Sequence, residues 1–430
     1  MLSVSISKRK KQASRKRIIM TLTLLALSAV ILCGVTVLLS CPVSDTAFSP
    51  EPSPHTDKQE TTAKASPSYA SCAKSTPFTA RISARNAVLI HADTGEILFG
   101  QNEHARAPMA STTKIMTALV ALEALPVETE VKITAESVGI EGSSIYLTEG
   151  EVLTLEALLY ALMLESANDA ATAIAIAVSG DVQTFAERMN QKAAALGLKD
   201  THFVNPHGLD DPEHYTTAYE LAIITKEALK HPVFQRIVAT QRTTIPHQGA
   251  SGVRLLLNHN KLLRSYEGAV GVKTGFTKKT GRCLVSAAKR DGLSLIAVTL
   301  HAPDDWRDHT AMLDYGFSLY EPVVLATPGQ FDTPLDVVGS TCEYVMIQNP
   351  DGLVLSLPKS RGEIIEIMEL PRFLYAPVSV GETIGRCAYY ELLPTGDIHF
   401  LGEVPLYAGH SAEALVYKKN ILEKLLDLIR

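Results

Sequence analysis

Ser111-Thr112-Thr113-Lys114, followed along the chain by Ser166-Ala167-Asn168 and Lys273-Thr274-Gly275, is the pattern that decides how this sequence is interpreted. An acyl-transfer site needs an attacking hydroxyl, amines that move its proton, and a strand that holds the substrate. The three motifs supply these parts in one order within one domain. Together they predict an enzyme that attacks an amide carbonyl through a serine.

The first motif is informative because of its surroundings. Ser111 and Lys114 open an apolar stretch that predicts a helix from 111 to about 125. Residues three apart share a helix face, so the lysine amine reaches the serine hydroxyl. An ordinary serine cap followed by a surface lysine is the alternative. The same spacing also occurs in regions that we expect to be unfolded, at Ser5/Lys8, Ser7/Lys10 and Ser71/Lys74.

A serine hydroxyl becomes a good nucleophile only when a neighbouring base takes its proton. Lys114 serves as that base only if its pKa is lowered, by burial or by another cation. We expect Lys273 to be that second cation, provided that the fold brings it close to Lys114. Burial inside a cleft would act in the same direction.

The second motif is the only Ser-x-Asn in the sequence. The Ser166 hydroxyl is suited to relaying a proton between a lysine and the leaving amine. The Asn168 side chain offers both a donor and an acceptor, which suits a substrate amide. A polar turn between two helices is the alternative.

The Lys-Thr-Gly triplet occurs at 273–275 and again at 279–281, and the copy at 273–275 is taken as the third motif. On a strand that lines the cleft, Lys273 would supply charge and Thr274 a hydroxyl for a substrate carboxylate. Gly275 would allow a substrate backbone to approach closely. The backbone N–H groups of Ser111 and Phe276 are the candidates for an oxyanion hole. A turn at a strand edge is the alternative.

Composition fits a folded enzyme and argues against a nucleic-acid partner. The chain has 40 basic and 46 acidic side chains, a net charge of −6, and 46% apolar residues. Binding of nucleic acid would require a basic face. His207 and His214 flank Asp210 and Asp211, a grouping that suggests either a metal site or turn structure near the cleft. Turn structure is the favoured interpretation, so we expect no metal and no other cofactor.

The N-terminal part predicts attachment to a membrane. Residues 1–17 form a basic region without acids, and residues 18–40 form an apolar segment. At about 1.5 Å per residue, this segment is long enough to cross a hydrocarbon core of roughly 30 Å. With the basic region in the cytoplasm, the remainder is extracytoplasmic. The segment is either a retained anchor, which its length favours, or a cleaved signal peptide. A lipoprotein linked through Cys41 is a third possibility.

Residues 41–79 are rich in Ser, Thr, Pro, Ala and Lys, so they predict a disordered linker. An α/β domain is expected from 80 to 325. Its first hairpin, at 87–91 and 97–99, should join later strands in one antiparallel sheet. Further helices are expected over 153–163, 170–178, 181–196 and 219–231, the last closed by Pro232, and strands over 283–288 and 295–300.

A small β domain is expected over 327–408, because short alternating runs are separated there by turns. Residues 411–430 read as an amphipathic helix that packs on this β domain or contacts the membrane. Cys342 and Cys387 both fall in the C-terminal region. They could pair in an oxidising compartment, and two free thiols are at least as consistent with the spacing.

With these motifs the chain resembles the penicillin-binding proteins and serine β-lactamases. It is most similar to the low-molecular-mass D-alanyl-D-alanine carboxypeptidases, peptidase family S11. The resemblance spans about 80–408 and implies an α/β (α+β) fold: a β-lactamase/transpeptidase-like catalytic domain with an antiparallel sheet flanked by helices, then a small all-β domain. Beyond the three motifs it rests on Ala107–Lys114, Gly142–Leu147, Ser166–Ala170, Phe203–Leu209 and Gly271–Phe276.

The resemblance also implies roles for the motif residues. Ser111 would be acylated, Lys114 would be the general base, and Ser166, Asn168 and Lys273 would support both steps. The implied reaction removes the terminal D-alanine from peptidoglycan stem pentapeptides, and β-lactam antibiotics would acylate the same serine. Relatives often bind the substrate carboxylate with a downstream arginine.

Arg307 is the candidate for that arginine. Three other functions stay open on the same fold. A β-lactamase is disfavoured because no Glu-x-x-Leu-Asn segment follows Asn168. A D,D-endopeptidase is closer in chemistry. A wall-peptide sensor without turnover is disfavoured by the intact Ser111, Lys114 and Lys273.

Overall fold

The computed structural model describes residues 77–247 and 252–416. The predicted basic region, the apolar segment and nearly all of the linker lie outside the described residues, as does most of the predicted C-terminal helix. Within the described ranges, no helix combines the length and the apolar character needed to cross a membrane.

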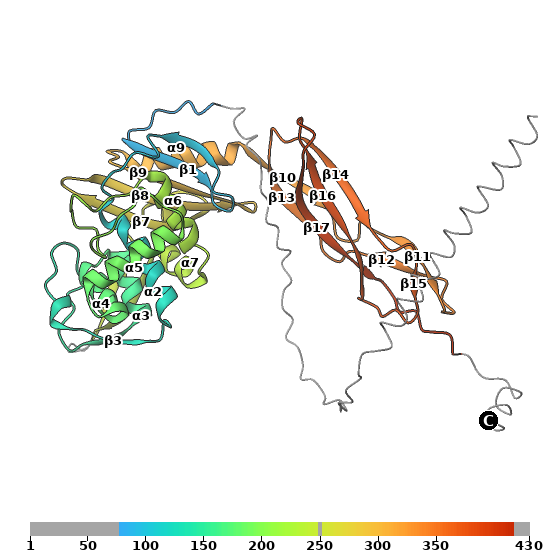
Figure 1. Ribbon diagram of the computed structural model, residues 1–430, viewed down its shortest axis with the longest axis horizontal. Helices are drawn as coiled ribbons and strands as arrows, with labels where there is room; N and C mark the ends of the chain where they lie inside the picture. Colours follow the sequence, from blue (N-terminus) through green and yellow to red (C-terminus); the bar gives the residue numbers. More distant parts are fainter. Residues whose placement is uncertain (1–76, 248–251, 417–430) are drawn as a thin grey trace, which may run out of the picture. The chain divides into compact units, whose positions relative to one another are not determined.

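A five-stranded antiparallel sheet forms the framework of the catalytic domain within the described residues (Figure 1). Its order is β2-β1-β9-β8-β7. The strands are β1 (Asn86–His91), β2 (Ile97–Gln101), β7 (Ala269–Thr277), β8 (Gly281–Arg290) and β9 (Leu293–Leu300). Because β1 pairs with both β2 and β9, the predicted hairpin does join the later strands, and the expected antiparallel sheet is confirmed.

Both faces of this sheet are covered, and the side chains of β1 alternate between two cores. Val88 and Ile90 pack in the larger core, which is shared with the helices that follow Ser111. Ala87 and Leu89 pack in a second core on the other face, against the last helix of the domain. Alternation along a strand sends successive side chains to opposite faces, so a strand with two covered faces reads as continuously apolar.

Helices and two short hairpins complete the catalytic domain. The helices are α2 (Lys114–Ala124), α3 (Leu155–Tyr160), α4 (Asn168–Ser179), α5 (Val182–Ala195), α6 (Ala218–Ala228), α7 (Pro232–Ala239), α8 (Leu262–Ser265) and α9 (Asp305–Ser318), with 3₁₀ turns at Ala110–Thr113 and Ala135–Ser137 and a π-helical turn at Ala161–Glu165. The hairpins pair β3 (Glu130–Lys132) with β4 (Val152–Thr154), and β5 (Arg242–His247) with β6 (Gly252–Leu257).

Two helix boundaries differ from the prediction. The helix expected over 153–163 begins at Leu155, because Leu153 belongs to β4 and the Thr154 hydroxyl caps the helix by accepting from Ala157 N at 3.2 Å. Pro232 does not merely end the preceding helix but begins α7. Proline is tolerated at a first helical position because the N–H group that it lacks would have no partner within the helix.

The strands of the C-terminal β region begin earlier in the sequence than the expected boundary at 327. Its strands are β10 (Tyr320–Ala326), β11 (Thr333–Val338), β12 (Tyr344–Gln348), β13 (Leu353–Pro358), β14 (Glu363–Glu369), β15 (Leu374–Tyr375), β16 (Thr383–Leu392) and β17 (Ile398–Ala408). Since β10 pairs with β13, residues 320–326 belong with the β strands. The larger sheet has the order β14-β16-β17-β12-β11-β15 within the described residues.

The predicted C-terminal helix does not begin at Ser411. Ala412 forms a β-bridge with Val378, and Ala414 forms one with Ser340, so residues 411–416 are extended. Pairing with the β domain supplies backbone hydrogen bonds there that a helix would otherwise provide. Among the described cysteines, Cys342 and Cys387 are both free, so the disulfide considered from the sequence is not formed.

Candidate active site

Lys114 lies where it can take the proton of Ser111. Ser111 sits in the 3₁₀ turn and Lys114 is the first residue of α2, which places the lysine Nζ 3.0 Å from the serine Oγ. The same Nζ lies 2.7 Å from Asn168 Oδ1 and 2.5 Å from the His207 carbonyl oxygen. A neutral amine has two N–H groups and one lone pair. If the two other oxygens accept the N–H groups, the lone pair is directed at the serine hydroxyl.

The surroundings of Lys114 favour its neutral form. The side chain is fully buried, and burial is the main cause that lowers its pKa well below the usual value. The positive charge of Lys273 lowers the pKa further, while the Asp169 carboxylate opposes the shift. The sequence-based expectation named burial and a second cation, and both act here, with burial the larger cause.

Lys273 lies on β7, and its side chain is also buried. Burial lowers the pKa of Lys273 to about 7, and the Glu165 carboxylate opposes that shift. Its Nζ donates to the Thr274 carbonyl oxygen at 3.0 Å. Lys273 is therefore close enough to influence Lys114 and has a charge that changes near neutral pH.

Ser166 is held in a special conformation at the end of the π-helical turn. Its backbone is left-handed, with φ at 60°, which non-glycine residues seldom adopt. Its Oγ is buried and has no hydrogen-bond partner among the described residues. Ser166 also lines the same cleft as Ser111. A strained backbone and an unsatisfied hydroxyl at a cleft are typical of functional residues.

Asn168 begins α4 and joins the motif residues to a neighbouring loop. Besides accepting from Lys114, its side chain donates through Nδ2 to the Glu141 carbonyl oxygen at 2.5 Å. Its backbone N–H donates to the Ser143 carbonyl oxygen at 2.7 Å. These contacts make Asn168 a residue that positions Lys114, while its predicted contact with substrate stays a prediction.

The cleft itself has a volume of about 350 Å³. Thr274, Gly275 and Phe276 of β7 form part of its wall together with Ser111 and Ser166. A larger cavity of about 1170 Å³ lies elsewhere in the domain, beside the turn after β1 and the helices α6 and α7, and contains none of the motif residues. The site is therefore identified by the reactive residues that line the smaller cleft, and not by cavity volume.

Two functional candidates were missed by the sequence analysis. Arg282 lines the cleft from β8, where it pairs in register with Phe276, and its guanidinium bonds Asp305 Oδ1 at 2.7 Å. Ser143 lines the cleft from the loop before β4. The hairpin after the third motif offered a signal for Arg282, because a tight turn at 277–281 places it opposite Phe276.

Arg307, the arginine chosen from the sequence, does not line the cleft. It is 64% exposed and pairs with Asp304 at 3.2 Å. The residue before it, Trp306, does line the cleft, and the Arg282 guanidinium lies 5.7 Å from its ring centre. The cleft arginine therefore comes from a strand, and α9 supplies its acidic and aromatic neighbours.

His207 and His214 have contacts that match the structural interpretation. The His214 ring bonds the Thr113 hydroxyl at 2.7 Å and accepts from Val204 N at 3.1 Å. Burial lowers the pKa of His207 to about 3 and that of His214 to about 4, so both rings are neutral. The His214 ring thus links Val204 to Thr113 before α2, and the His207 ring accepts from Leu209 N at 3.3 Å within its own turn. Among the described residues, no cluster of potential metal ligands is present.

This combination of fold and site defines a class of protein. A helix that begins with Ser-x-x-Lys, packed against an edge strand that carries Lys-Thr-Gly, is the arrangement of active-site-serine enzymes of the penicillin-binding protein and transpeptidase type. Solved structures agree. The chain aligns with penicillin-binding protein 5 of Haemophilus influenzae at a TM-score of 0.55 and 27% identity, covering 78% of this chain and 99% of that one.

The chain belongs to the D-alanyl-D-alanine carboxypeptidase family, peptidase family S11, whose model matches residues 71–304. It is 32% identical over 335 residues to the D-alanyl-D-alanine carboxypeptidase DacF of Bacillus subtilis, covering 76% of this chain and 85% of that protein. A serine-to-alanine mutant of the Streptomyces K15 DD-transpeptidase is also similar, with 33% identity, a TM-score of 0.53, and coverage of 56% of this chain and all of that one.

Proposed function

We propose that this protein is a serine-type D-alanyl-D-alanine carboxypeptidase that removes the terminal D-alanine from peptidoglycan stem pentapeptides. β-Lactam antibiotics act on it as covalent inhibitors. The observation that carries the proposal is the Lys114 amine, buried, lowered in pKa and 3.0 Å from the Ser111 oxygen. Such an amine can remove the serine proton, which a lysine of ordinary pKa cannot do at neutral pH.

In the acylation step, Lys114 Nζ accepts the proton of Ser111 while Oγ attacks the carbonyl carbon between the two D-alanines. Negative charge then develops on the carbonyl oxygen, and the backbone N–H groups of Ser111 and Phe276 are the proposed donors to it. When the C–N bond breaks, the proton passes to the leaving amine. The Ser166 hydroxyl, buried without a protein partner among the described residues, is the proposed relay.

The terminal carboxylate of the substrate is the feature that distinguishes a carboxypeptidase substrate. Lys273, the Thr274 hydroxyl and Arg282 are the proposed groups that receive it, because charge-assisted bonds to a carboxylate are stronger than neutral ones. After D-alanine leaves, water occupies its place and hydrolyses the acyl-enzyme. Gly275 keeps the wall of the cleft thin beside the reacting centre.

The test is an assay on the purified protein with a peptide that ends in Lys-D-Ala-D-Ala. Release of free D-alanine is measured, and nitrocefin hydrolysis is followed in parallel. We expect peptide turnover with only slow loss of nitrocefin. Fast nitrocefin hydrolysis would instead support a β-lactamase, and peptide binding without either activity would support a sensor. A crosslinked dimer of stem peptides distinguishes a D,D-endopeptidase.

A transpeptidase is the second candidate, favoured by the similarity to the Streptomyces K15 DD-transpeptidase. The same acyl-enzyme can be resolved by an amine instead of water. Adding glycine as an acceptor to the peptide assay separates the two outcomes. A carboxypeptidase keeps releasing the tetrapeptide acid, whereas a transpeptidase forms the glycine-extended product.

This function requires an extracytoplasmic location, where peptidoglycan peptides occur. We propose that segment 18–40 directs the chain across the membrane and then either stays as an anchor, is cleaved as a signal peptide, or is cleaved before a lipid-modified Cys41. The support is the run of uncharged residues preceded by seven basic side chains. Mass spectrometry of the mature N-terminus distinguishes the three forms.

A further inference from the structure

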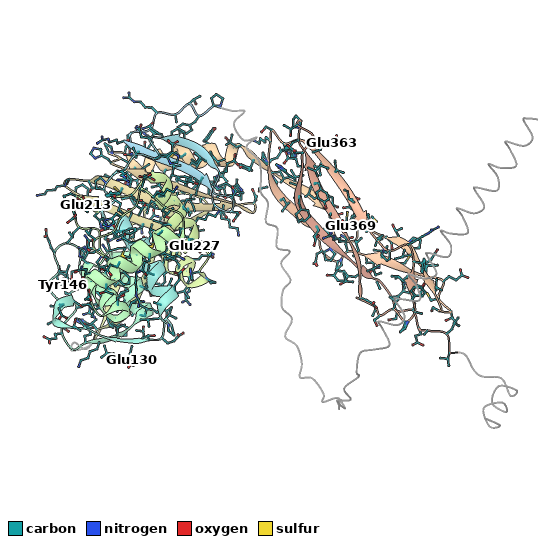
Figure 2. The ribbon with its side chains drawn as sticks, in the orientation of Figure 1. Glu130, Tyr146, Glu213, Glu227, Glu363 and Glu369 are labelled. Atoms are coloured by element: carbon teal, nitrogen blue, oxygen red, sulfur yellow. The ribbon has the colours of Figure 1, made fainter. Side chains whose placement is uncertain are left out.

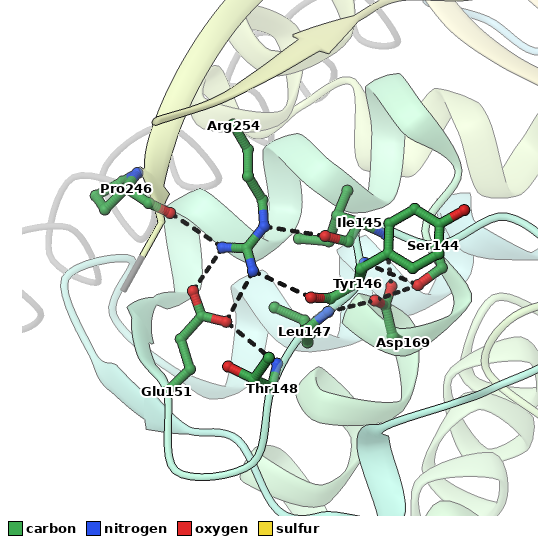
Figure 3. A network of polar contacts seen from close by, with 9 residues as sticks. All are labelled: Ser144, Ile145, Tyr146, Leu147, Thr148, Glu151, Asp169, Pro246 and Arg254. Atoms are coloured by element: carbon green, nitrogen blue, oxygen red, sulfur yellow. Dashed lines mark hydrogen bonds and ion pairs between the residues drawn. The ribbon is translucent and has the colours of Figure 1, made fainter. Parts of the chain in front are cut away.

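Arg254 of β6 uses all five of its N–H donors to hold one loop beside the cleft (Figure 3). A guanidinium has five N–H groups, and each one here has an acceptor. Nε donates to Ile145 O at 2.9 Å, Nη1 to Glu151 Oε1 at 2.5 Å and to Pro246 O at 3.2 Å, and Nη2 to Glu151 Oε2 at 2.9 Å and to Tyr146 O at 3.2 Å. The Arg254 and Glu151 side chains are only 8% and 0% exposed.

Asp169 holds the same loop from the start of α4. Its Oδ2 accepts from the Ser144 hydroxyl at 2.6 Å and from Leu147 N at 3.0 Å, and its Oδ1 accepts from Ile145 N at 3.3 Å. Asp169 directly follows Asn168, which positions Lys114. We call residues 143–147 the Tyr146 loop. The loop is thus fixed both to the catalytic motif and to the β5–β6 hairpin.

These contacts hold Tyr146 in an unusual backbone conformation with its side chain exposed. Its backbone is left-handed, with φ at 58°, and its side chain is 82% exposed at the outer edge of the catalytic domain (Figure 2). A bulky residue persists in this conformation only where its surroundings impose it. The contacts therefore fix the Tyr146 backbone in a conformation that leaves its ring in solvent.

The position of the ring relative to the cleft suggests its use. Ser143, three residues earlier, lines the cleft, so the Tyr146 Cα lies within about 11 Å of a cleft-wall residue. A stem peptide that enters the cleft must continue across its rim. An exposed tyrosine offers a flat apolar face at little cost in side-chain entropy.

We infer that Tyr146 is a substrate-specificity residue whose ring packs against the part of the substrate that extends beyond the scissile dipeptide. The chemistry it recognises is a C–H face, from the aliphatic side chain of the stem peptide or from an attached sugar ring. Arg254 and Asp169 are positioning residues that fix this ring. The inference rests on the proposed function for the identity of the substrate.

Tyr146→Ala and Tyr146→Phe test the inference. The substrates are a stem pentapeptide with its amino sugar, the same pentapeptide without it, and benzylpenicillin, which carries no fluorophore and no peptide beyond the mimic of the scissile dipeptide. Tyr146→Ala is expected to lower kcat/KM for a long substrate by about 2- to 10-fold, through KM rather than kcat. Tyr146→Phe retains the ring and normal KM, and penicillin acylation is unchanged in both variants.

The pattern of loss identifies the contact. Loss with both pentapeptides assigns the peptide side chain, and loss only with the sugar-bearing one assigns the sugar; either result supports the inference. Unchanged KM for both pentapeptides overturns it, and so does an equal loss of penicillin acylation, which would indicate a general disturbance of the cleft. Tyr375→Ala, at a tyrosine that is 72% exposed in the β domain, is the matched control and should change nothing.

The wild-type protein reports separately on the proposed function. If it releases no D-alanine, binding of the pentapeptides to Ser111→Ala, measured by calorimetry with and without Tyr146→Ala, still tests the ring. The Kd for the pentapeptides is then expected to rise by the same factor of about 2 to 10, which corresponds to the loss of one aromatic contact. No weakening in that measurement overturns the inference independently of turnover.

Arg254→Lys tests the positioning role. Lysine keeps the charge near Glu151 but cannot make the forked bonds to the Ile145 and Tyr146 carbonyls. We expect the same rise in KM for the long substrates, with kcat and penicillin acylation retained. Arg254→Ala is unsuitable, because it leaves a buried carboxylate without its partner and is expected to unfold the domain. An unchanged KM in Arg254→Lys would overturn the positioning role.

Discussion

The backbone nitrogen of Ser111 lies directly against Gly275. A Cβ atom placed on Gly275 would be 3.1 Å from Ser111 N, 3.2 Å from Thr112 N and 3.3 Å from the Ala110 Cβ. The edge strand β7 and the turn before α2 therefore approach so closely that a Cβ at Gly275 would require its neighbours to shift by a few tenths of an ångström. This contact sets the distance between the nucleophile and the strand that is proposed to bind substrate.

Gly275→Ala is expected to slow acylation by up to about 10-fold, because a shift of a few tenths of an ångström at Ser111 is a fraction of the roughly 1 Å misplacement that costs about 100-fold. Second-order labelling by fluorescent penicillin measures the effect. Gly252→Ala is the matched control, since a Cβ at Gly252 meets nothing within 4 Å. Normal labelling in Gly275→Ala would show that the strand shifts without consequence.

Lys114→Arg should lose acylation by at least about a hundredfold. Arginine keeps a positive charge at every relevant pH and cannot accept the Ser111 proton, and general bases contribute roughly 10²- to 10⁴-fold. The rate of penicillin labelling is the measurement, with Ser111→Ala as the reference for complete loss. Near-normal labelling in Lys114→Arg would assign the base to another group.

Lys273→Met should raise the free energy of unfolding near pH 7, by about 1–3 kcal/mol, because a buried ammonium is replaced by an apolar chain. The folded-state pKa of Lys273, about 7, lies below the value of about 10.4 in the unfolded chain. The unfolded state therefore binds more protons between these values, and the contribution of Lys273 to stability grows as pH rises from about 7 to 10. The variant should lack that rise.

Urea unfolding at pH 6.5 and pH 9 checks this expectation. The difference between wild type and Lys273→Met should be largest at the lower pH and shrink at the higher one. Activity should fall in the variant at both values. A difference that is independent of pH would show that Lys273 is not deprotonated on folding.

Ser166→Ala should lower the catalytic activity without lowering the stability of the fold. The Ser166 Oγ is buried without a partner among the described residues, so its removal costs no protein hydrogen bond. The melting temperature is expected to stay within about 2 °C of wild type, while kcat falls by about 10²- to 10³-fold. Ser179→Ala removes another buried unpaired hydroxyl of α4, away from the cleft, and should leave kcat unchanged. A large loss of stability in Ser166→Ala would favour a structural role.

Arg282→Gln, which keeps an N–H donor for the buried Asp305 carboxylate, should lower kcat/KM by about 10- to 100-fold for peptides with a free terminal carboxylate, since hydrogen bonds to charged groups contribute about 1.5–3 kcal/mol. A peptide ending in an amide should be affected much less. Arg307→Ala is the comparison variant, because Arg307 is exposed and pairs only with acids of its own helix region in the described chain. Equal losses with acid and amide substrates would contradict the assignment.

Much of the fold followed from local patterns. The helix expected over 181–196 is α5, Val182–Ala195, because its apolar period is regular and the Asp181 side chain caps it by accepting from Thr184 N at 2.7 Å. In contrast, α9 escaped prediction. Its first turn carries Asp305 and Asp308, which look like surface residues but are buried. Asp308 bonds the backbone of Ser83, a partner 225 positions away.

The sequence by itself determined the order of the motifs and the nearness of Ser111 to Lys114, because residues three apart on one helix must share a face. It could not determine which groups surround the Lys114 amine, or that burial lowers its pKa. The oxygens of Asn168 and His207 that complete its surroundings come from 54 and 93 positions away. Only tertiary packing brings these atoms together. Burial and charge act through space between residues that are far apart in sequence, so they produce no periodic pattern that sequence analysis could detect.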